Sequence, residues 1–194
     1  MQGLLTLSRG IDWVNEKIAI IANWLVLICA VVSTLNAAVR YMLDYSWFRP
    51  FLPFFKAIDM PSNGWLEAQW YMFAGMVLLG APYVLKVNEH VRVDLIYGFA
   101  TDKWRNRIDL FGHLFFLFPM CILLIWITYP WFYDSWRIGE QSSNAGGLVR
   151  WPVKLMLPLG FALLAVQGVS ELIKTVAAMM GVAQIIPKYE RPLQ

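Results

Sequence analysis

The chain has 194 residues, of which 59% are hydrophobic, 15% aromatic and 15% charged. A soluble domain usually carries about a quarter of its residues as charged ones, so this composition excludes a water-soluble globule, which would expose apolar surface that it could not hide. The net charge of +3 is too small and too scattered for a nucleic-acid-binding surface, so no nucleic acid partner is expected.

Four apolar stretches are long enough to cross a hydrocarbon core, which takes about 20 helical residues. We place them at about residues 18–43, 66–87, 108–133 and 155–182. Four charged residues precede the first stretch, which does not fit a cleavable signal peptide, so this stretch should be retained. Runs this long and continuous cannot be the alternating strands of a barrel. The sequence therefore predicts an all-α integral membrane protein with four transmembrane helices in a single membrane domain.

The distribution of basic residues predicts the orientation of these helices. When both termini and the loop at residues 86–109 lie on one side, that side holds ten of the 16 Lys and Arg residues and the other side holds six. The positive-inside rule then places the N-terminus, the C-terminus and this loop in the cytoplasm.

The connection after the first span, at about residues 45–65, is rich in Trp, Phe and Pro. Its prolines prevent a continuous helix, and its aromatic side chains are unfavourable in water. Two interpretations stay open for this outer aromatic loop. It lies on the outer membrane surface without a partner, or it packs on a partner protein.

The connection between the second and third spans contains an amphipathic stretch at about residues 91–100. Val91, Leu95 and Phe99 line one side of a short helix, while Arg92 and Asp94 remain polar. This pattern predicts an amphipathic interfacial helix that lies in the plane of the cytoplasmic headgroups.

Reactive groups that could converge on a catalytic site are scarce. HExxH, GxSxG, P-loop and Gly-rich dinucleotide motifs do not occur in the sequence. The two histidines are His90, in a loop, and His113, a few residues inside the third span. A membrane haem b needs paired axial histidines within the bilayer. We therefore expect neither a haem nor any other cofactor, no metal and no enzymatic activity.

One polar cluster falls within the fourth span. Gln167, Glu171 and Lys174 share a helix face, and Glu171 and Lys174 can neutralise one another. An ionisable residue inside a membrane is usually kept for a function. The cluster either extends to the cytoplasmic surface by snorkelling or forms a polar interface with another membrane subunit.

Two short strings beside the membrane contain more polar and charged residues than a simple connection between spans needs. Residues 88–94 place four ionisable groups within seven positions, and residues 140–148 form an outer loop of small and polar residues. Charged strings of the first kind often only anchor to lipid headgroups, and Gly-Gly loops are usually turns.

These strings form part of an ordered set of five motifs that resembles a known family. The motifs are LEAQWYMF at 66–73, LGAPY at 79–83 with NEHVRVD at 88–94, IDLFG at 108–112, SWR at 135–137 with EQSSNAGGL at 140–148, and PVKLMLPLGF at 152–161 running into QGVSEL at 167–172. Over about residues 15–180 the chain is similar to the small membrane subunit of tripartite ATP-independent periplasmic (TRAP) transporters, the DctQ-like family.

The resemblance implies a non-catalytic subunit of a secondary transporter in the bacterial inner membrane. It implies three partners: a large sodium-coupled membrane subunit (DctM-like), a periplasmic binding protein that delivers an organic acid, and phospholipid at the subunit interface. The small subunit would scaffold the large one and hold no substrate site. Two alternatives belong to other classes: a four-helix membrane anchor of a redox complex, with haem b or quinone, and a small transporter or channel that acts alone.

The matching motifs also supply candidates for contact with partner proteins. On the outer side the resemblance implies a set from three motifs: Glu67, Gln69, Trp70, Glu140, Ser142, Ser143, Asn144 and Lys154. On the cytoplasmic side it implies the charged string and one intramembrane acid: Asn88, Glu89, His90, Arg92, Asp94 and Glu171.

Overall fold

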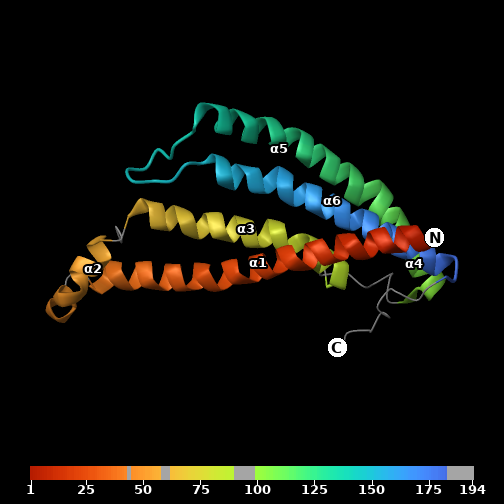
Figure 1. The fold of residues 1–194 in the computed structure, drawn as a ribbon, viewed down its shortest axis with the longest axis horizontal. Helices are drawn as coiled ribbons and strands as arrows, with labels where there is room; N and C mark the ends of the chain where they lie inside the picture. Colours follow the sequence, from red (N-terminus) through yellow and green to blue (C-terminus); the bar gives the residue numbers. More distant parts are fainter. Residues whose placement is uncertain (43–44, 58–61, 90–98, 183–194) are drawn as a thin grey trace.

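The computed structural model describes residues 1–42, 45–57, 62–89 and 99–182. In these ranges the long helices are α1 (Gln2–Met42), α3 (Asn63–Val87), α5 (Phe118–Ile138) and α6 (Trp151–Met179). Helix α4 (Asp102–Gly112) continues through one π-helical segment, η3 (His113–Leu117), into α5. Figure 1 shows these helices running along the long axis of the molecule.

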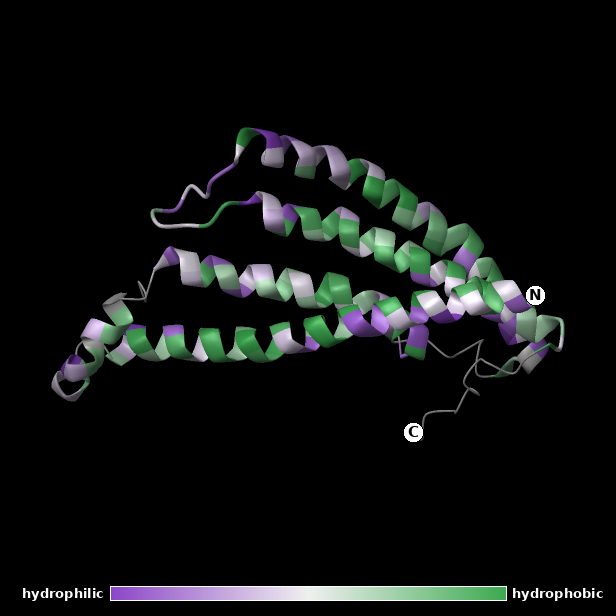
Figure 2. Ribbon diagram, in the orientation of Figure 1, coloured by the Kyte–Doolittle hydropathy of each residue, from purple (hydrophilic) through white to green (hydrophobic). Residues whose placement is uncertain are grey.

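Four of the helical stretches are long and apolar enough to cross a membrane, which confirms the predicted four-helix architecture. Helix α1, however, begins at Gln2 rather than near residue 18. At about 1.5 Å per residue, its 41 residues exceed what a hydrocarbon core of about 30 Å needs. Figure 2 shows hydrophilic residues in the part of α1 nearest the N-terminus and mostly hydrophobic residues in the rest.

The four long helices lie in a row rather than in a closed bundle. Helix α3 packs between α1 and α6, and α6 packs between α3 and α5 (Figure 1). The N-terminal part of α1 also reaches α6, so α6 contacts all three of the other long helices. Ten of the 29 residues of α6 are buried, against two of the 21 residues of α5. Helix α6 is therefore the centre of the row, and α5 forms an edge with apolar side chains on its surface.

Small residues allow the closest approaches in this row. A Cβ atom on Gly160 of α6 would lie 2.7 Å from the Cβ and 3.0 Å from the carbonyl oxygen of Leu78 in α3. A Cβ atom on Gly168 would lie 2.6 Å from a methyl carbon of Leu117, in the π-helical segment before α5. Close packing of small residues is a main source of attraction between helices in lipid, where the hydrophobic effect does not drive them together.

We expect Gly160→Ala to destabilise the row by about 1–3 kcal/mol, because the new methyl group meets backbone as well as a side chain. Thermal unfolding of the detergent-solubilised protein measures the effect. Gly112→Ala is the matched control, since no atom lies within 4 Å of its added Cβ. A similar melting temperature for the Gly160→Ala variant and the wild type would contradict the close α3–α6 contact.

A small helical lobe follows α1. It consists of a 3-10 helix, η1 (Ser46–Phe51), and a short helix, α2 (Leu52–Ala57), and it lies at one end of the molecule, beyond the start of α3 (Figure 1). The expected break in helical structure is therefore present. Phe48 is 7% exposed and packs against a small apolar group: Val39, Met42, Phe55 and Trp65.

The predicted interfacial helix at residues 91–100 falls mostly outside the described residues, which resume at Phe99. The side chain of Phe99 is 79% exposed. Helix α4 follows directly and carries Trp104, which is also exposed, with the guanidinium group of Arg107 5.2 Å from the centre of its ring.

Candidate functional site

The connection between α5 and α6, residues 139–150, is folded as a short hairpin that we call the α5–α6 loop. Gly139 ends α5 with a φ of 63°, a left-handed conformation that glycine adopts without strain. Beyond it, the backbone N–H of Arg150 donates to the carbonyl of Glu140 at 2.8 Å, and that of Ser142 donates to the carbonyl of Leu148 at 3.1 Å. The loop thus has a defined backbone shape.

Glu67 of α3 holds this loop in place. Its carboxylate is 3% exposed and accepts hydrogen bonds from the backbone N–H of Leu148 at 2.7 Å and from the side-chain amide of Asn144 at 2.9 Å. The hydroxyl of Ser142 also donates to it. Gly147 lies so close that a Cβ there would be 2.9 Å from a carboxylate oxygen of Glu67. Hydrogen bonds to a charged acceptor are the stronger ones in proteins, so Glu67 fixes the loop to the end of α3.

Two further residues of α3 contact the same loop. Asn63 donates to the carbonyl of Ala145 at 2.9 Å, and the hydroxyl of Tyr71 donates to the carbonyl of Val149 at 3.0 Å. Asn63, Glu67 and Tyr71 are four residues apart and therefore lie on one face of the helix. The sequence analysis did not select Asn63 or Tyr71, although each lies four residues from Glu67 and therefore on the same helix face.

Lys154 joins the loop to the first turn of α6. Its ammonium group forms an ion pair with Glu140 and lies 4.3 Å from the ring centre of Trp131 in α5. The residue is 8% exposed. The ammonium group of Lys154 holds the pKa of Glu140 below its ordinary value. This ion pair thus connects the ends of α5 and α6.

The lowered pKa of Glu140 predicts a pH dependence of loop order. Since the folded-state pKa lies below the unfolded value, the stabilisation is present at pH above about 4.3, the usual value for Glu, and is lost as the pH falls through the folded-state pKa. We expect hydrogen exchange of the loop amides, corrected for intrinsic rates, to increase as the pH falls from neutral into this acidic range. Glu140→Gln should weaken that dependence without abolishing it, because the carboxylate of Glu67 also holds the loop. An unchanged dependence would contradict the assignment.

The remaining outer candidates lie outside this group of contacts. The Gln69 side chain is half-buried, and the backbone carbonyl of Gln69 accepts a hydrogen bond from the thiol of Cys29 at 3.4 Å. Trp70 is 46% exposed and packs edge-on against Tyr71. Ser143 is exposed on the α5–α6 loop.

On the cytoplasmic side only part of the candidate string is described. Asn88 ends α3 in a left-handed conformation with a φ of 60°, which Asn tolerates better than most residues. The backbone N–H of Glu89 donates to the carbonyl of Val84 at 3.2 Å, which closes the helix end. His90, Arg92 and Asp94 lie outside the described residues.

The polar residues of α6 form a second group of contacts, with the N-terminal part of α1, which we call the α1–α6 polar cluster. The ammonium group of Lys174 lies 2.7 Å from a carboxylate oxygen of Asp12 and 2.7 Å from one of Glu171. The side-chain amide of Gln167 donates to Asp12 at 2.9 Å and to Glu171 at 2.8 Å. One cation therefore lies between two carboxylates from different helices.

Neutral residues extend the α1–α6 polar cluster on both sides. The hydroxyls of Ser8 and Ser170 are 2.7 Å apart, and the amide of Asn15 donates to Gln167 at 2.7 Å. All four residues are at most 2% exposed. The side chains of Glu171 and Lys174 are 14% and 8% exposed, and Lys174 pairs with Asp12 of α1 in the same chain. The interpretations of these residues as snorkelling or as an interface with another subunit did not include this pairing.

The α1 partners in this cluster were missed from the sequence. Ser8, Asp12 and Asn15 are spaced four and three residues apart, which places them on one helix face. This face was overlooked because the charges before the first span were assessed only as part of a possible signal peptide. A search for matching polar faces on two helices would have found it.

The fold and these contacts first define the class of protein: a multi-pass α-helical membrane protein whose polar groups hold its own helices and loop together. The family model for tripartite ATP-independent periplasmic transporters, DctQ component, matches residues 31–178. The chain belongs to this family and is a small permease component of a TRAP transporter, as the ordered motifs predicted. Searches of the curated proteins and of the solved structures give no significant match.

Proposed function

We propose that this chain pairs with the large sodium-coupled membrane subunit of a TRAP transporter and scaffolds it during uptake of an organic acid that a periplasmic binding protein delivers. Both termini would lie in the cytoplasm of a bacterium, and the α5–α6 loop would face the periplasm. Phospholipid would fill part of the groove between the two membrane subunits.

The arrangement of the long helices in a row is the observation that carries this proposal. A carrier that acts alone needs spans grouped around a substrate path, whereas here the long helices follow one another in a row, with the N-terminal part of α1 also reaching α6 (Figure 1). The α1–α6 polar cluster, the most polar part of the spans, joins two helices of the chain to one another. Membership of the DctQ family supports the same role.

The candidate contact residues take different parts in this proposal. Glu67 is buried under the α5–α6 loop, so we assign it the positioning of the loop. Ser143 and Trp70 are exposed and are available for direct contact with a partner. Gln69, Asn144, Glu140 and Lys154 support this outer surface from beneath or beside it. The string at residues 88–94 would contact the large subunit or anionic lipid on the cytoplasmic side.

Co-purification tests the pairing. The tagged chain is expressed with the large permease subunit of its transporter, solubilised in a mild detergent and passed over an affinity column and a sizing column. We expect both subunits to elute together at a fixed ratio. Reconstitution with the binding protein should then give organic-acid uptake that requires a sodium gradient and both membrane subunits.

Two results would contradict the proposal. One is a folded chain that never binds the large subunit in several detergents or in nanodiscs. The other is full uptake by liposomes that contain the large subunit and the binding protein without this chain. Uptake by this chain alone would instead establish the alternative of an independent transporter.

A further inference from the structure

The lobe between α1 and α3, residues 45–57, presents a connected group of aromatic rings that the proposed function does not use. We call it the aromatic lobe. Its central ring is Phe48, whose centroid lies 5.8 Å from that of Trp47, 6.0 Å from that of Phe51 and 5.4 Å from that of Phe55. Phe54 extends the group through Phe55 at 5.3 Å. The rings therefore form one continuous apolar unit.

The inner side of the lobe is attached at the end of the first apolar span. Phe48 packs against Val39, which is the last residue of α1 before the charged Arg40. Because the uncharged run of α1 ends at this point, Val39 marks the level where the hydrocarbon core gives way to headgroups. The contact thus places the lobe beside that boundary.

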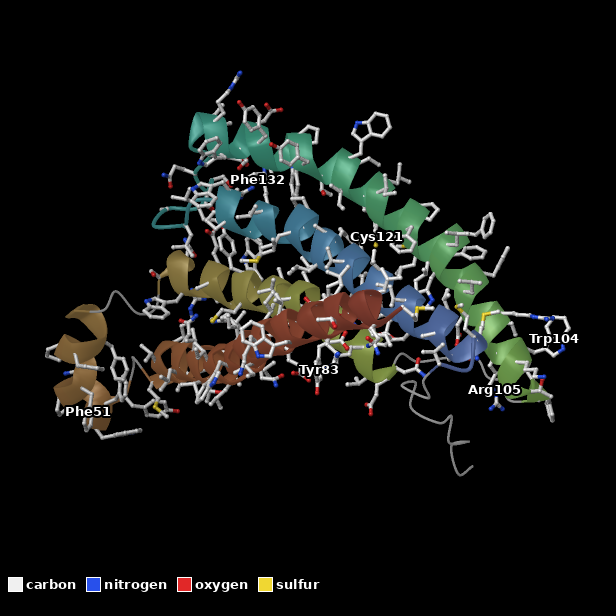
Figure 3. All side chains as sticks on the ribbon, turned by 45° about the vertical axis from the view of Figure 1, so that its right-hand side comes forward. Phe51, Tyr83, Trp104, Arg105, Cys121 and Phe132 are labelled. Atoms are coloured by element: carbon white, nitrogen blue, oxygen red, sulfur yellow. The ribbon has the colours of Figure 1, made fainter. Side chains whose placement is uncertain are left out.

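The outer side of the lobe exposes large aromatic side chains. Trp47 is 59% exposed, Phe51 56% and Phe54 65%. Phe48, by contrast, is buried against Val39. In Figure 3, Phe51 lies at the extreme end of the molecule, away from the long helices. Aromatic surface of this extent needs a covering other than water.

The residue types of the lobe, aromatic rings together with cations, indicate its covering. The 13 residues of the aromatic lobe contain Arg49 and Lys56 and no Asp or Glu. Aromatic side chains next to cations suit the region between lipid headgroups and acyl chains, where phosphates accept from the cations and the rings lie against the chains. We propose that the aromatic lobe is a membrane-interface anchor that inserts Trp47, Phe51 and Phe54 into the lipid leaflet around the outer end of α1.

Spin labels at single cysteines test this anchor in the full-length chain. Cys29 and Cys121 are first replaced by Ala, and a cysteine is introduced by Trp47→Cys or by Phe54→Cys. Both positions are exposed, so neither substitution removes the Phe48 core. Ser143→Cys on the exposed α5–α6 loop gives the aqueous reference. Ile122→Cys, 61% exposed near the middle of the spanning helix at residues 103–138, gives the deep reference.

The labelled chains are placed in nanodiscs of phosphatidylcholine and phosphatidylglycerol, alone and with the large subunit. Accessibility to oxygen and to a water-soluble nickel chelate is then compared. We expect spin labels at positions 47 and 54 to report depths between those of the two reference positions. Their accessibility to oxygen, relative to that to the nickel chelate, should be higher than at the aqueous reference. Nickel accessibility equal to that at Ser143→Cys would overturn the anchor. Protection from both reagents in the presence of the large subunit would also overturn it, because protein would then cover the lobe. The first outcome, measured on the chain alone, is independent of whether the subunits co-purify.

Discussion

Lys174→Gln is expected to destabilise the folded chain by about 3–5 kcal/mol, the usual cost of removing one partner from a buried ion pair. The side chain of Lys174 is 8% exposed, and its ammonium group is 2.7 Å from both Asp12 and Glu171. Without it, two carboxylates face each other between α1 and α6 with no cation to balance them. Unfolding in mixed micelles, followed by circular dichroism, measures the loss.

Two matched variants make this expectation specific. Lys86→Gln removes the same charge from an ion pair with Glu16, whose side chain is 48% exposed, and should cost less than about 1 kcal/mol. Asp12→Asn leaves one carboxylate opposite Lys174, so it should be milder than Lys174→Gln. Equal effects of Lys174→Gln and Lys86→Gln would show that the buried cluster does not hold α1 against α6.

Glu67→Ala is expected to release the α5–α6 loop from α3. The substitution leaves the backbone N–H of Leu148, the amide of Asn144 and the hydroxyl of Ser142 without their acceptor. A hydrogen bond to a charged acceptor contributes about 1.5–3 kcal/mol. We expect the loop to become sensitive to limited proteolysis while the helices remain folded. If the loop contacts partners as proposed, transport should fall by more than tenfold.

Ser143→Ala tests whether any substitution that affects this loop raises its sensitivity to protease, because Ser143 is exposed and lies outside the Glu67 contacts. It should leave the proteolysis pattern unchanged. Glu67→Gln is the second comparison, since it keeps a hydrogen-bond acceptor but removes the charge. Its sensitivity to protease should lie between that of Glu67→Ala and that of the wild type. A protease-resistant loop in Glu67→Ala would contradict the positioning role.

Hydropathy was sufficient to predict the membrane-spanning part of the fold, because the free-energy cost of exposed backbone in lipid requires continuous helices. It could not predict the first turns of α1. That segment contains Asp12 and Asn15, and it packs against α6 through polar contacts that a hydropathy average does not register. Nor could hydropathy predict the order of the helices in the row, which depends on close contacts such as Gly160 with Leu78.

The sequence predicted which residues belong to the candidate site better than it predicted how they are arranged in space. Motif resemblance selected Glu67, Glu140 and Lys154, and the structure brings all three to the α5–α6 loop or its base. The buried position of Glu67 under that loop could not be foreseen, because α3 and the loop are about 80 residues apart. Glu171 was singled out as an isolated intramembrane acid, and its partner Lys174 was expected, but the contribution of Asp12 required the three-dimensional contact.

The pairing of α1 with α6 also has a consequence for synthesis in the cell. The hydrogen bonds that join these helices connect residues 152 and 162 positions apart, so the first helix enters the bilayer long before its polar partners have left the ribosome. Asp12 gains its cation only when the last span is inserted. A chain that ends before Gln167 retains a polar face on α1 with no counterpart in α6. The α1–α6 polar cluster thus makes completion of the whole polypeptide a condition for a stable subunit in the membrane.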